Sequence, residues 1–347
     1  MIGVSDDNYY EDMSSAGSET SRTHLRRQWQ LEYYDDIWAI AATFADYQTI
    51  DPAIAAIDEP YKLLPSIAAD GIWRDGWLGL DYRLISETAY FARDDSVDGL
   101  RLHAEPRISL PLSYRGMYLT PEVALDFTGY QLNDEPEGND SSPRRTAPVV
   151  SVDSGAVLDR MAGKNNQWVM TLEPRIPYTY IPFRDQGDIP IFDTILADFN
   201  LVQLFRQNRF VGYDRLGDTS QISLGVTTRL LSAENGQEIV TATLGQTQFF
   251  DSGKVTLTDE IASDSNSSDY IAELGMKIWE NWNLDLRYQY DTDIDKTGKS
   301  SVRFQYRPEE SKAFNIAYRY ARDSLEQTDF SVAWPLADNW NFIGRYN

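Results

Sequence analysis

The chain of 347 residues contains no cysteine and only two histidines. Without cysteine it can form no internal disulfide, thiolate nucleophile or thiolate-ligated metal site, and its redox compartment cannot be read from cysteine usage. His24 and His103 lie far apart in different strand-like segments, and no HExxH, GxSxG, phosphate-binding-loop or dinucleotide-binding glycine pattern occurs. We therefore expect no catalytic residues, no metal site and no cofactor, and we expect that the protein is not an enzyme.

Basic charge and long apolar runs are also scarce. The 31 lysines and arginines are outweighed by 54 acidic residues, which gives a net charge of -23 and argues against nucleic acid as a partner, because phosphate binding needs a basic surface. No run of about 18 apolar residues occurs, which excludes an ordinary transmembrane helix, whereas a membrane β-strand needs only about 9 to 11 alternating residues. Residues 1–21 lack the basic and apolar regions of a secretory signal, so an exported protein would be represented here by a processed or incomplete copy.

The sequence does contain clear two-residue periodicity. Between Trp282 and Tyr290, large apolar side chains occupy the even positions and polar side chains the odd ones, as in a β-strand with one apolar and one polar face. Similar runs predict about 15 strands, several of them longer than the mean of about 5 to 6 residues in soluble proteins. The predicted segments are 25–33, 38–48, 77–91, 100–112, 117–132, 149–161, 168–183, 222–231, 239–250, 270–279, 282–290, 302–306, 314–320, 330–334 and 340–346. Long strands of alternating polarity predict an all-β fold, an antiparallel transmembrane β-barrel.

The connections between these strands are of two kinds. Residues 280–281, 308–312 and 338–339 form short turns, whereas 133–148 and 251–269 are long, acidic and rich in Ser, Asn, Gly and Pro. Short turns on one rim and long loops on the other are typical of outer-membrane barrels. Trp and Tyr residues near strand ends favour interfacial girdles, although aromatic residues are common in any β-protein.

Arginines recur on the polar faces of the C-terminal strands. Those that would line a lumen, if the apolar faces meet lipid, are Arg287, Arg303, Arg307 and Arg319. They could contact an anionic ligand or pair with nearby Asp and Glu. The strongly negative net charge favours pairing, because unpaired charge in a confined space is costly.

The stretch from Glu173 to Arg229 begins and ends as strands but has a long middle with loop chemistry. Between Ile189 and Phe210 it carries many large apolar side chains, and a loop of this length and composition is expected to be ordered. We predict a folded insertion with a short helix at 194–206, whose apolar side chains pack against a plug or the barrel wall. The residues that we single out for this structural role are Asp185, Gln186, Pro190, Asp193, Phe205, Asn208, Arg209, Phe210, Gly212, Asp214 and Arg215.

Two other functions are open at this point. A carbohydrate-active β-protein could use two of the 54 carboxylates as an acid and base pair, although carboxylates spread along the whole chain favour solvated loops and a lumen. A generic porin or substrate-specific channel would share the alternating strands, but it has no need of the insertion.

Several strings in the same stretch resemble one family. EPRIPYTYIPFRDQGDIPIFD, LFRQNRFVGYDRLGD and LGVTTRLL are similar to the core of the LptD (OstA/Imp) family of outer-membrane lipopolysaccharide-assembly proteins. The resemblance extends upstream to THLRRQWQLEY, DYQTIDP and PYKLLPSI, and downstream to the strand that ends at Phe249 and Phe250. It therefore covers nearly the whole chain.

The resemblance implies a non-enzymatic, 26-stranded barrel in the outer membrane of a Gram-negative bacterium, surrounded by membrane lipid, with its lumen partly filled by an LptE-like lipoprotein plug. It implies that an N-terminal jellyroll receives lipopolysaccharide from a periplasmic Lpt bridge. The barrel translocon would then insert lipopolysaccharide into the outer leaflet through an opening between its first and last strands.

Against the family pattern, the chain lacks a signal peptide, the jellyroll, the family's cysteines and the final strands. We therefore expect residues 1–347 to be a single barrel-domain fragment of about 15 strands out of 26, with the exit-gate strands outside it. Two unpaired sheet edges cannot be satisfied in hydrocarbon. We predict that this fragment alone does not form a stable monomeric barrel.

Overall fold

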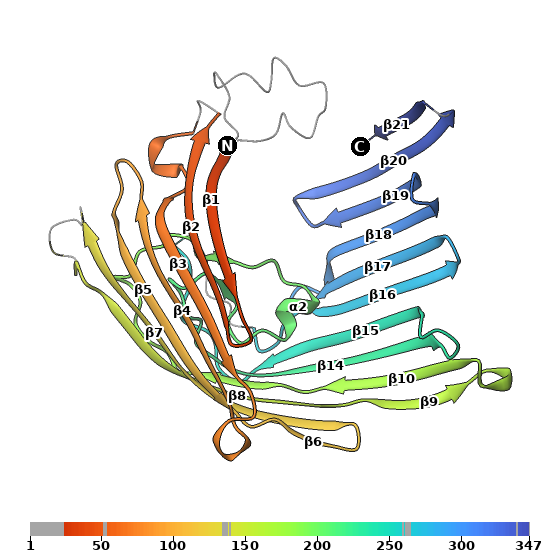
Figure 1. Ribbon diagram of the computed structural model, residues 1–347, viewed down its shortest axis with the longest axis horizontal. Helices are drawn as coiled ribbons and strands as arrows, with labels where there is room; N and C mark the ends of the chain where they lie inside the picture. Colours follow the sequence, from red (N-terminus) through yellow and green to blue (C-terminus); the bar gives the residue numbers. More distant parts are fainter. Residues whose placement is uncertain are drawn as a thin grey trace.

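The computed structural model describes residues 24–50, 54–133, 138, 140–258, 260, 265–337 and 339–346. One large antiparallel sheet of 19 strands curves around a small two-stranded sheet and a short helix (Figure 1). The strands of the large sheet are β1 (His24–Tyr34), β2 (Trp38–Thr49), β3 (Lys62–Trp73), β4 (Asp81–Ala92), β5 (Asp98–Ser109), β6 (Leu112–Tyr114), β7 (Met117–Asn133), β8 (Arg144–Ala156), β9 (Leu158–Ala162), β10 (Trp168–Arg175), β11 (Tyr178–Ile181), β14 (Thr219–Ser232), β15 (Glu238–Phe249), β16 (Tyr270–Trp279), β17 (Trp282–Asp291), β18 (Lys296–Glu309), β19 (Lys312–Ala321), β20 (Leu325–Ala337) and β21 (Trp340–Tyr346). The other elements are β12 (Ile195–Leu196), β13 (Phe210–Val211), α2 (Leu201–Leu204) and the 3-10 turns η1 (Ala56–Asp58), η2 (Trp77–Gly79) and η3 (Lys164–Asn166).

The large sheet is an up-and-down meander, in which strands pair with their neighbours in sequence. Three pairs of consecutive strands each occupy a single position in the wall: β5 with β6, β8 with β9, and β10 with β11. Pro111 and Pro177 lie at two of these interruptions, where a residue without an amide hydrogen breaks the ladder. The 19 strands thus fill sixteen positions, close to the 15 strands predicted. Within the described residues, β1 pairs only with β2 and β21 only with β20.

The strand register pairs apolar side chains with apolar ones and acidic side chains with basic ones. On neighbouring strands β17 and β18, Leu284 lies opposite Phe304, and Asp285 lies opposite Arg303. Apolar pairs and opposite charges therefore alternate along the ladder, each on its own face. The predicted antiparallel all-β fold and its two-residue periodicity are confirmed.

Strand β5 buries polar side chains and exposes apolar ones. On β5, Arg101 and His103 are fully buried, whereas Leu100 and Leu102 are 37% and 46% exposed. Because successive side chains of a strand point to opposite faces, the polar side chains all lie on one face. Apolar residues on the outer face and polar residues on the inner face are the pattern of a strand wall that meets lipid.

Residues 182–218, the inner loop, connect β11 to β14. Figure 1 shows this segment, with α2, lying inside the curve of the sheet. The loop contains the β12–β13 pair, in which Ile195 and Leu196 lie opposite Val211 and Phe210. The loop contains the short helix α2 and packs on the chain's own wall, while its predicted role in packing against a plug stays a prediction.

Local predictions were less accurate. The helix expected at 194–206 is confined to α2, because Asn200 caps it and accepts hydrogen bonds from the amides of Val202 and Gln203, while the segment before it pairs as β12. Strand β3 was missed, since Pro65 and Gly71 interrupt its alternating pattern. The strand predicted from residue 77 starts only at Asp81.

Candidate functional site: the inner loop and its buried charge network

Asp214 is the centre of the contacts that hold the inner loop. Its side chain is fully buried, and one carboxylate oxygen accepts hydrogen bonds from Arg101 at 2.6 Å and from the Tyr130 hydroxyl at 2.9 Å. The other oxygen accepts three backbone amides, those of Phe192, Asp193 and Thr194, at 2.9 to 3.2 Å. Burial alone would raise the pKa of Asp214, but Arg101 and these donors stabilise the carboxylate and hold its pKa below the usual value.

Arg101, on β5, joins two segments of the loop to the wall. Its guanidinium donates to both carboxylate oxygens of Asp193 at 2.7 Å and to Asp214, and it also contacts Glu87 of β4 at 2.6 Å. The aromatic ring of Phe91 lies beneath it, 4.6 Å from the guanidinium carbon. Both terminal nitrogens of this fully buried arginine are thus paired with carboxylates, and removing one partner of a buried ion pair costs about 3 to 5 kcal/mol.

Arg145, on β8, makes a second anchor. It donates to Asp126 at 2.9 Å and to the backbone carbonyls of Tyr213 and Asp214 at 3.0 and 3.1 Å. It also donates to Gln186, whose side chain in turn bonds the backbone N–H and C=O of Leu216. Arg145 therefore fixes the beginning and the end of the loop relative to each other.

A third anchor lies nearer to α2. Arg107 of β5 donates to Glu105 and Glu122 at 2.8 Å and to Gln207 of the loop at 2.9 Å. Gln207 itself donates to Glu122 and to Ser151. Three arginines of the wall thus bind the loop at three separated points.

Apolar contacts accompany these polar anchors. Phe192 of the loop stacks on Phe91 at 4.6 Å between ring centroids, within a buried cluster that also contains Ile189, Tyr130 and Leu132. Leu216 packs in a second cluster with residues of β7, β8 and β11. Phe192 and Leu216 of the loop therefore face the wall of this chain.

Glycines in the wall make room for α2. A Cβ atom built on Gly225 would clash with the ring of Phe205, and one built on Gly245 would clash with Leu204. The Leu204 carbonyl accepts a hydrogen bond from Ser223 at 2.7 Å. Close approach of the helix thus depends on two wall positions that have no side chain.

The other predicted loop residues have definite places. Asn208 accepts from Gly217 N and donates to Arg215 O, while Arg209 binds Glu260 and the Val255 carbonyl at 2.6 Å. Phe210 and Arg215 are buried, and Arg215 donates to the Pro190 carbonyl. Gly212, next to Thr194, has a φ of 96°. Asp185 is exposed and accepts a hydrogen bond from Gly187 N.

The four predicted lumen arginines lie away from this network. Arg303 pairs with Asp285, Arg319 with Asp329 and Arg287 with Glu273, and the Arg307 side chain donates to the Glu310 carbonyl. Arg287 and Arg319 both lie opposite Ser301, so with Arg303 they share the face of Lys299, which contacts Asp198 of the inner loop. The face is therefore the inner one, and the predicted preference for pairing with acidic residues describes these three side chains.

Sequence reasoning missed the wall side of the network. Arg101, Arg145, Glu87 and Tyr130 read as ordinary polar-face positions, because their partners lie up to 113 residues away along the chain. One usable signal existed: charged or ionisable residues occupy four successive inner-face positions of β5, at 101, 103, 105 and 107.

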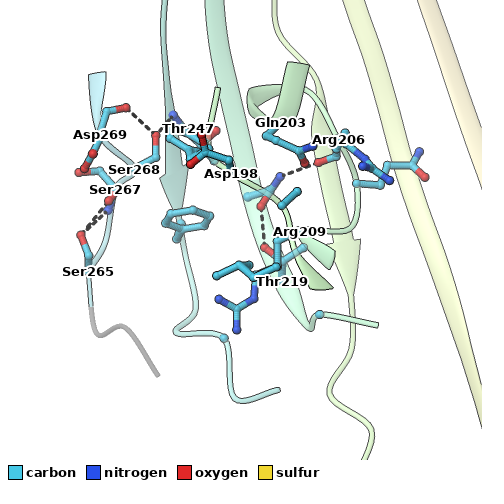
Figure 2. Close-up of a pocket in the computed structure, with 18 of the residues that line it drawn as sticks. Asp198, Gln203, Arg206, Arg209, Thr219, Thr247, Ser265, Ser267, Ser268 and Asp269 are labelled. Atoms are coloured by element: carbon cyan, nitrogen blue, oxygen red, sulfur yellow. Dashed lines mark hydrogen bonds between the residues drawn. The ribbon is translucent and has the colours of Figure 1, made fainter. Parts of the chain in front are cut away.

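A polar cavity of about 600 Å³ lies beside α2, between the inner loop and strands β14 to β18. Figure 2 shows Gln203 and Arg206 on one side of it and Ser265 to Asp269 on the other. The charged and aromatic side chains that line it are Arg206, Arg209, Lys299, Asp198, Asp218, Asp251, Asp269, Asp293, Phe199 and Phe249. Three basic and five acidic side chains, together with several hydroxyl and amide groups, suit a ligand rich in hydroxyl groups more than an apolar one.

These features define a class of protein. The chain is an antiparallel β-wall with an apolar outer face that is compatible with lipid, and an ordered loop is bound to its inner face by buried charges. None of the helices in the described part of the chain is long and apolar enough to cross a membrane.

The chain belongs to the LptD family: the family model described as LPS transport system D matches residues 3–340. Proteins named "LPS-assembly protein LptD" are similar over 99% of this chain, with 39% identity to that of Nitrosococcus oceani and 36% identity to that of Thiobacillus denitrificans. The match covers 47% of each relative, so the chain spans about half the length of the curated relatives. Among solved structures, the siderophore receptor PirA of Pseudomonas aeruginosa aligns with a TM-score of 0.40 and 10% identity, over 93% of this chain and 72% of that one.

Proposed function

We propose that this chain is part of the wall of a lipopolysaccharide translocon in the outer membrane of a Gram-negative bacterium. Family membership supports the transport of lipopolysaccharide. The exposed apolar outer face of the wall supports a place in a membrane. In this proposal residues 1–347 form one barrel-domain segment, and the protein moves its substrate without making or breaking a covalent bond.

The observation that carries the proposal is the pairing of an apolar outer face with a polar inner face that holds a cavity. Lipopolysaccharide has acyl chains, phosphates and sugars. Its polar part matches the mixed charges beside α2, such as Arg206, Lys299 and Asp269, while its acyl chains match a lipid-facing surface. In the described residues, no feature favours a generic porin over this function.

The proposed partners follow the family. An LptE-like lipoprotein would occupy the remaining interior, and a periplasmic bridge would deliver lipopolysaccharide through a jellyroll outside these residues. The lateral exit would lie between strands outside this chain.

Site-specific photo-crosslinking in living cells tests the proposal. Gln221 lines the cavity and Leu224 is 50% exposed on the same strand, at a position of opposite parity. A photoreactive residue at 221 is expected to capture lipopolysaccharide, whereas the matched residue at 224 is expected to capture membrane lipid. Equal capture of lipopolysaccharide at both positions, or none at 221, would contradict the proposal.

A further inference from the structure

Three ionisable side chains converge on the inner face beneath the loop. One nitrogen of His103 and one carboxylate oxygen each of Glu105 and Asp126 lie within 4.8 Å of one another. His103 and Glu105 are two residues apart on β5 and therefore share a face. Asp126 lies on β7 two residues before Thr128, which is directly opposite His103, so all three belong to the inner face.

His103 is buried with one ring nitrogen unused. The residue has no exposed surface, and its ring lies under Tyr213 at 3.9 Å between centroids. Nδ1 is 3.0 Å from the Thr128 hydroxyl, whereas Nε2 has no hydrogen-bond partner among the described residues. A buried polar atom without a hydrogen-bond partner is destabilising and therefore needs a physical explanation. A proton on Nδ1, donated to Thr128, leaves the Nε2 lone pair free for a ligand.

The two carboxylates also have unused oxygens. Glu105 is 7% and Asp126 is 5% exposed. In the described part of the chain, the side-chain hydrogen bonds to them end on Glu105 Oε1, from Arg107, and on Asp126 Oδ1, from Arg145. The hydrogen bonds from Arg107 and Arg145 hold the two carboxylates in place and leave Glu105 Oε2 and Asp126 Oδ2 available as ligand atoms.

The charge of the surrounding network favours a cation. Four guanidinium groups meet six carboxylates, which leaves a formal charge of -2 in a region that is largely removed from water. The guanidinium groups belong to Arg101, Arg107, Arg145 and Arg215, and the carboxylates to Glu87, Glu105, Glu122, Asp126, Asp193 and Asp214. Uncompensated charge at such a site is costly, and one divalent cation would neutralise it.

We propose that His103, Glu105 and Asp126 bind a divalent transition-metal cation. One imidazole nitrogen with two carboxylate oxygens suits Zn²⁺, which takes nitrogen and oxygen ligands at about 2.0 to 2.2 Å. Ligand atoms at that distance are about 3 to 4 Å apart, so small rotations of the three side chains would provide three ligands and leave the fourth tetrahedral position to a water molecule. The ion links β5 to β7 directly below Tyr213, and so it fixes the part of the wall on which the end of the inner loop rests.

Metal binding by the purified intact protein tests the proposal. The protein is refolded into detergent free of lipopolysaccharide, since that lipid binds cations itself, and is stripped with a chelator and titrated with Zn²⁺. We expect one equivalent to bind, and we expect His103→Gln to weaken this binding at least tenfold. His24→Gln, which alters the other histidine of the chain, is the matched control and is expected to bind like wild type.

A second variant and a second readout distinguish the loss of a metal ligand from misfolding of the protein. Glu105→Gln keeps the shape of the side chain and is also expected to weaken binding at least tenfold, while gel mobility before and after heating reports whether each variant is folded. Co²⁺ should give a visible absorption band in wild type and in His24→Gln that is lost in His103→Gln. No stoichiometric Zn²⁺ binding by wild type, or equal binding by folded His103→Gln and Glu105→Gln, would overturn the proposal.

Discussion

Arg101 on β5 and Arg303 on β18 both lie on the inner face of the wall and both pair with an aspartate. The Arg101 side chain is fully buried under the inner loop, whereas the Arg303 side chain is 58% exposed. Among the described residues, Ile271 is the last buried one along the sequence. The same kind of ion pair is thus a structural anchor in β4 to β8 and a solvated surface pair in β17 to β20.

This difference shows that coverage by the inner loop, rather than the strands themselves, determines whether an ion pair on the inner face is buried and how much it contributes to stability. An exposed pair contributes about 0 to 1 kcal/mol, while breaking a buried pair costs several times more. A substitution under the inner loop should therefore lower the free energy of unfolding more than a matched substitution outside it.

The largest effect is expected for Asp214→Ala. The change leaves Arg101 short of a partner and deprives Tyr130 and three backbone amides of their acceptor. The free energy of unfolding should fall by about 3 to 5 kcal/mol, measured by urea unfolding in lipid bilayers. The control Asp285→Ala should cost at most about 1 kcal/mol, and similar losses in both variants would remove the distinction between the two regions.

Phe210→Ser should be the next most damaging. Phe210 is 1% exposed within the inner loop, whereas Phe342 on β21 is 51% exposed. We expect a loss of about 3 kcal/mol for Phe210→Ser and a much smaller one for Phe342→Ser. Because the loop holds its shape through such contacts, Phe210→Ser should also reduce co-purification of an LptE-like lipoprotein and raise envelope permeability. Unchanged assembly and permeability would count against a role of the loop in holding the plug.

Gly225→Ala tests the close approach of α2 to the wall. The added methyl would clash with Phe205, whereas at Gly275 the nearest atom would be 3.9 Å away. Overpacking should lower the free energy of unfolding by about 2 kcal/mol for Gly225→Ala, with little change for Gly275→Ala. Limited proteolysis should cut the inner loop faster only in the first variant, and equal rates would argue against the packing described here.

The smallest effect concerns pH. The pKa of Asp214 is lowered in the folded protein, so its contribution to stability is present above the ordinary aspartate pKa of about 4 and is lost as the pH falls through the folded-state value. The difference in unfolding free energy between wild type and Asp214→Asn should therefore be constant from pH 6 to about 5 and shrink below about 4. A difference that grows on acidification would have the wrong sign.

The alternating strands and the existence of an ordered insertion could be predicted from sequence, because both are local patterns. Trp282 to Tyr290 shows its two faces directly in the residue order. The anchors could not be predicted, because the pairing of Arg101 with Asp214 depends on strand register and on the path of the inner loop. Residues such as Asp185 were selected with Asp214 from the same segment, and only the fold separates an exposed carboxylate from a buried one.

The most direct test of the account compares two sets of amides by hydrogen exchange. Phe192, Asp193 and Thr194 donate to the buried Asp214, while Asp293 and Ile294 donate in the same way to Asp291 in an exposed turn. If the inner loop is anchored to the wall, the first set should exchange as slowly as amides of β5, and the second set should exchange rapidly. Rapid exchange of both sets would contradict the anchoring of the inner loop.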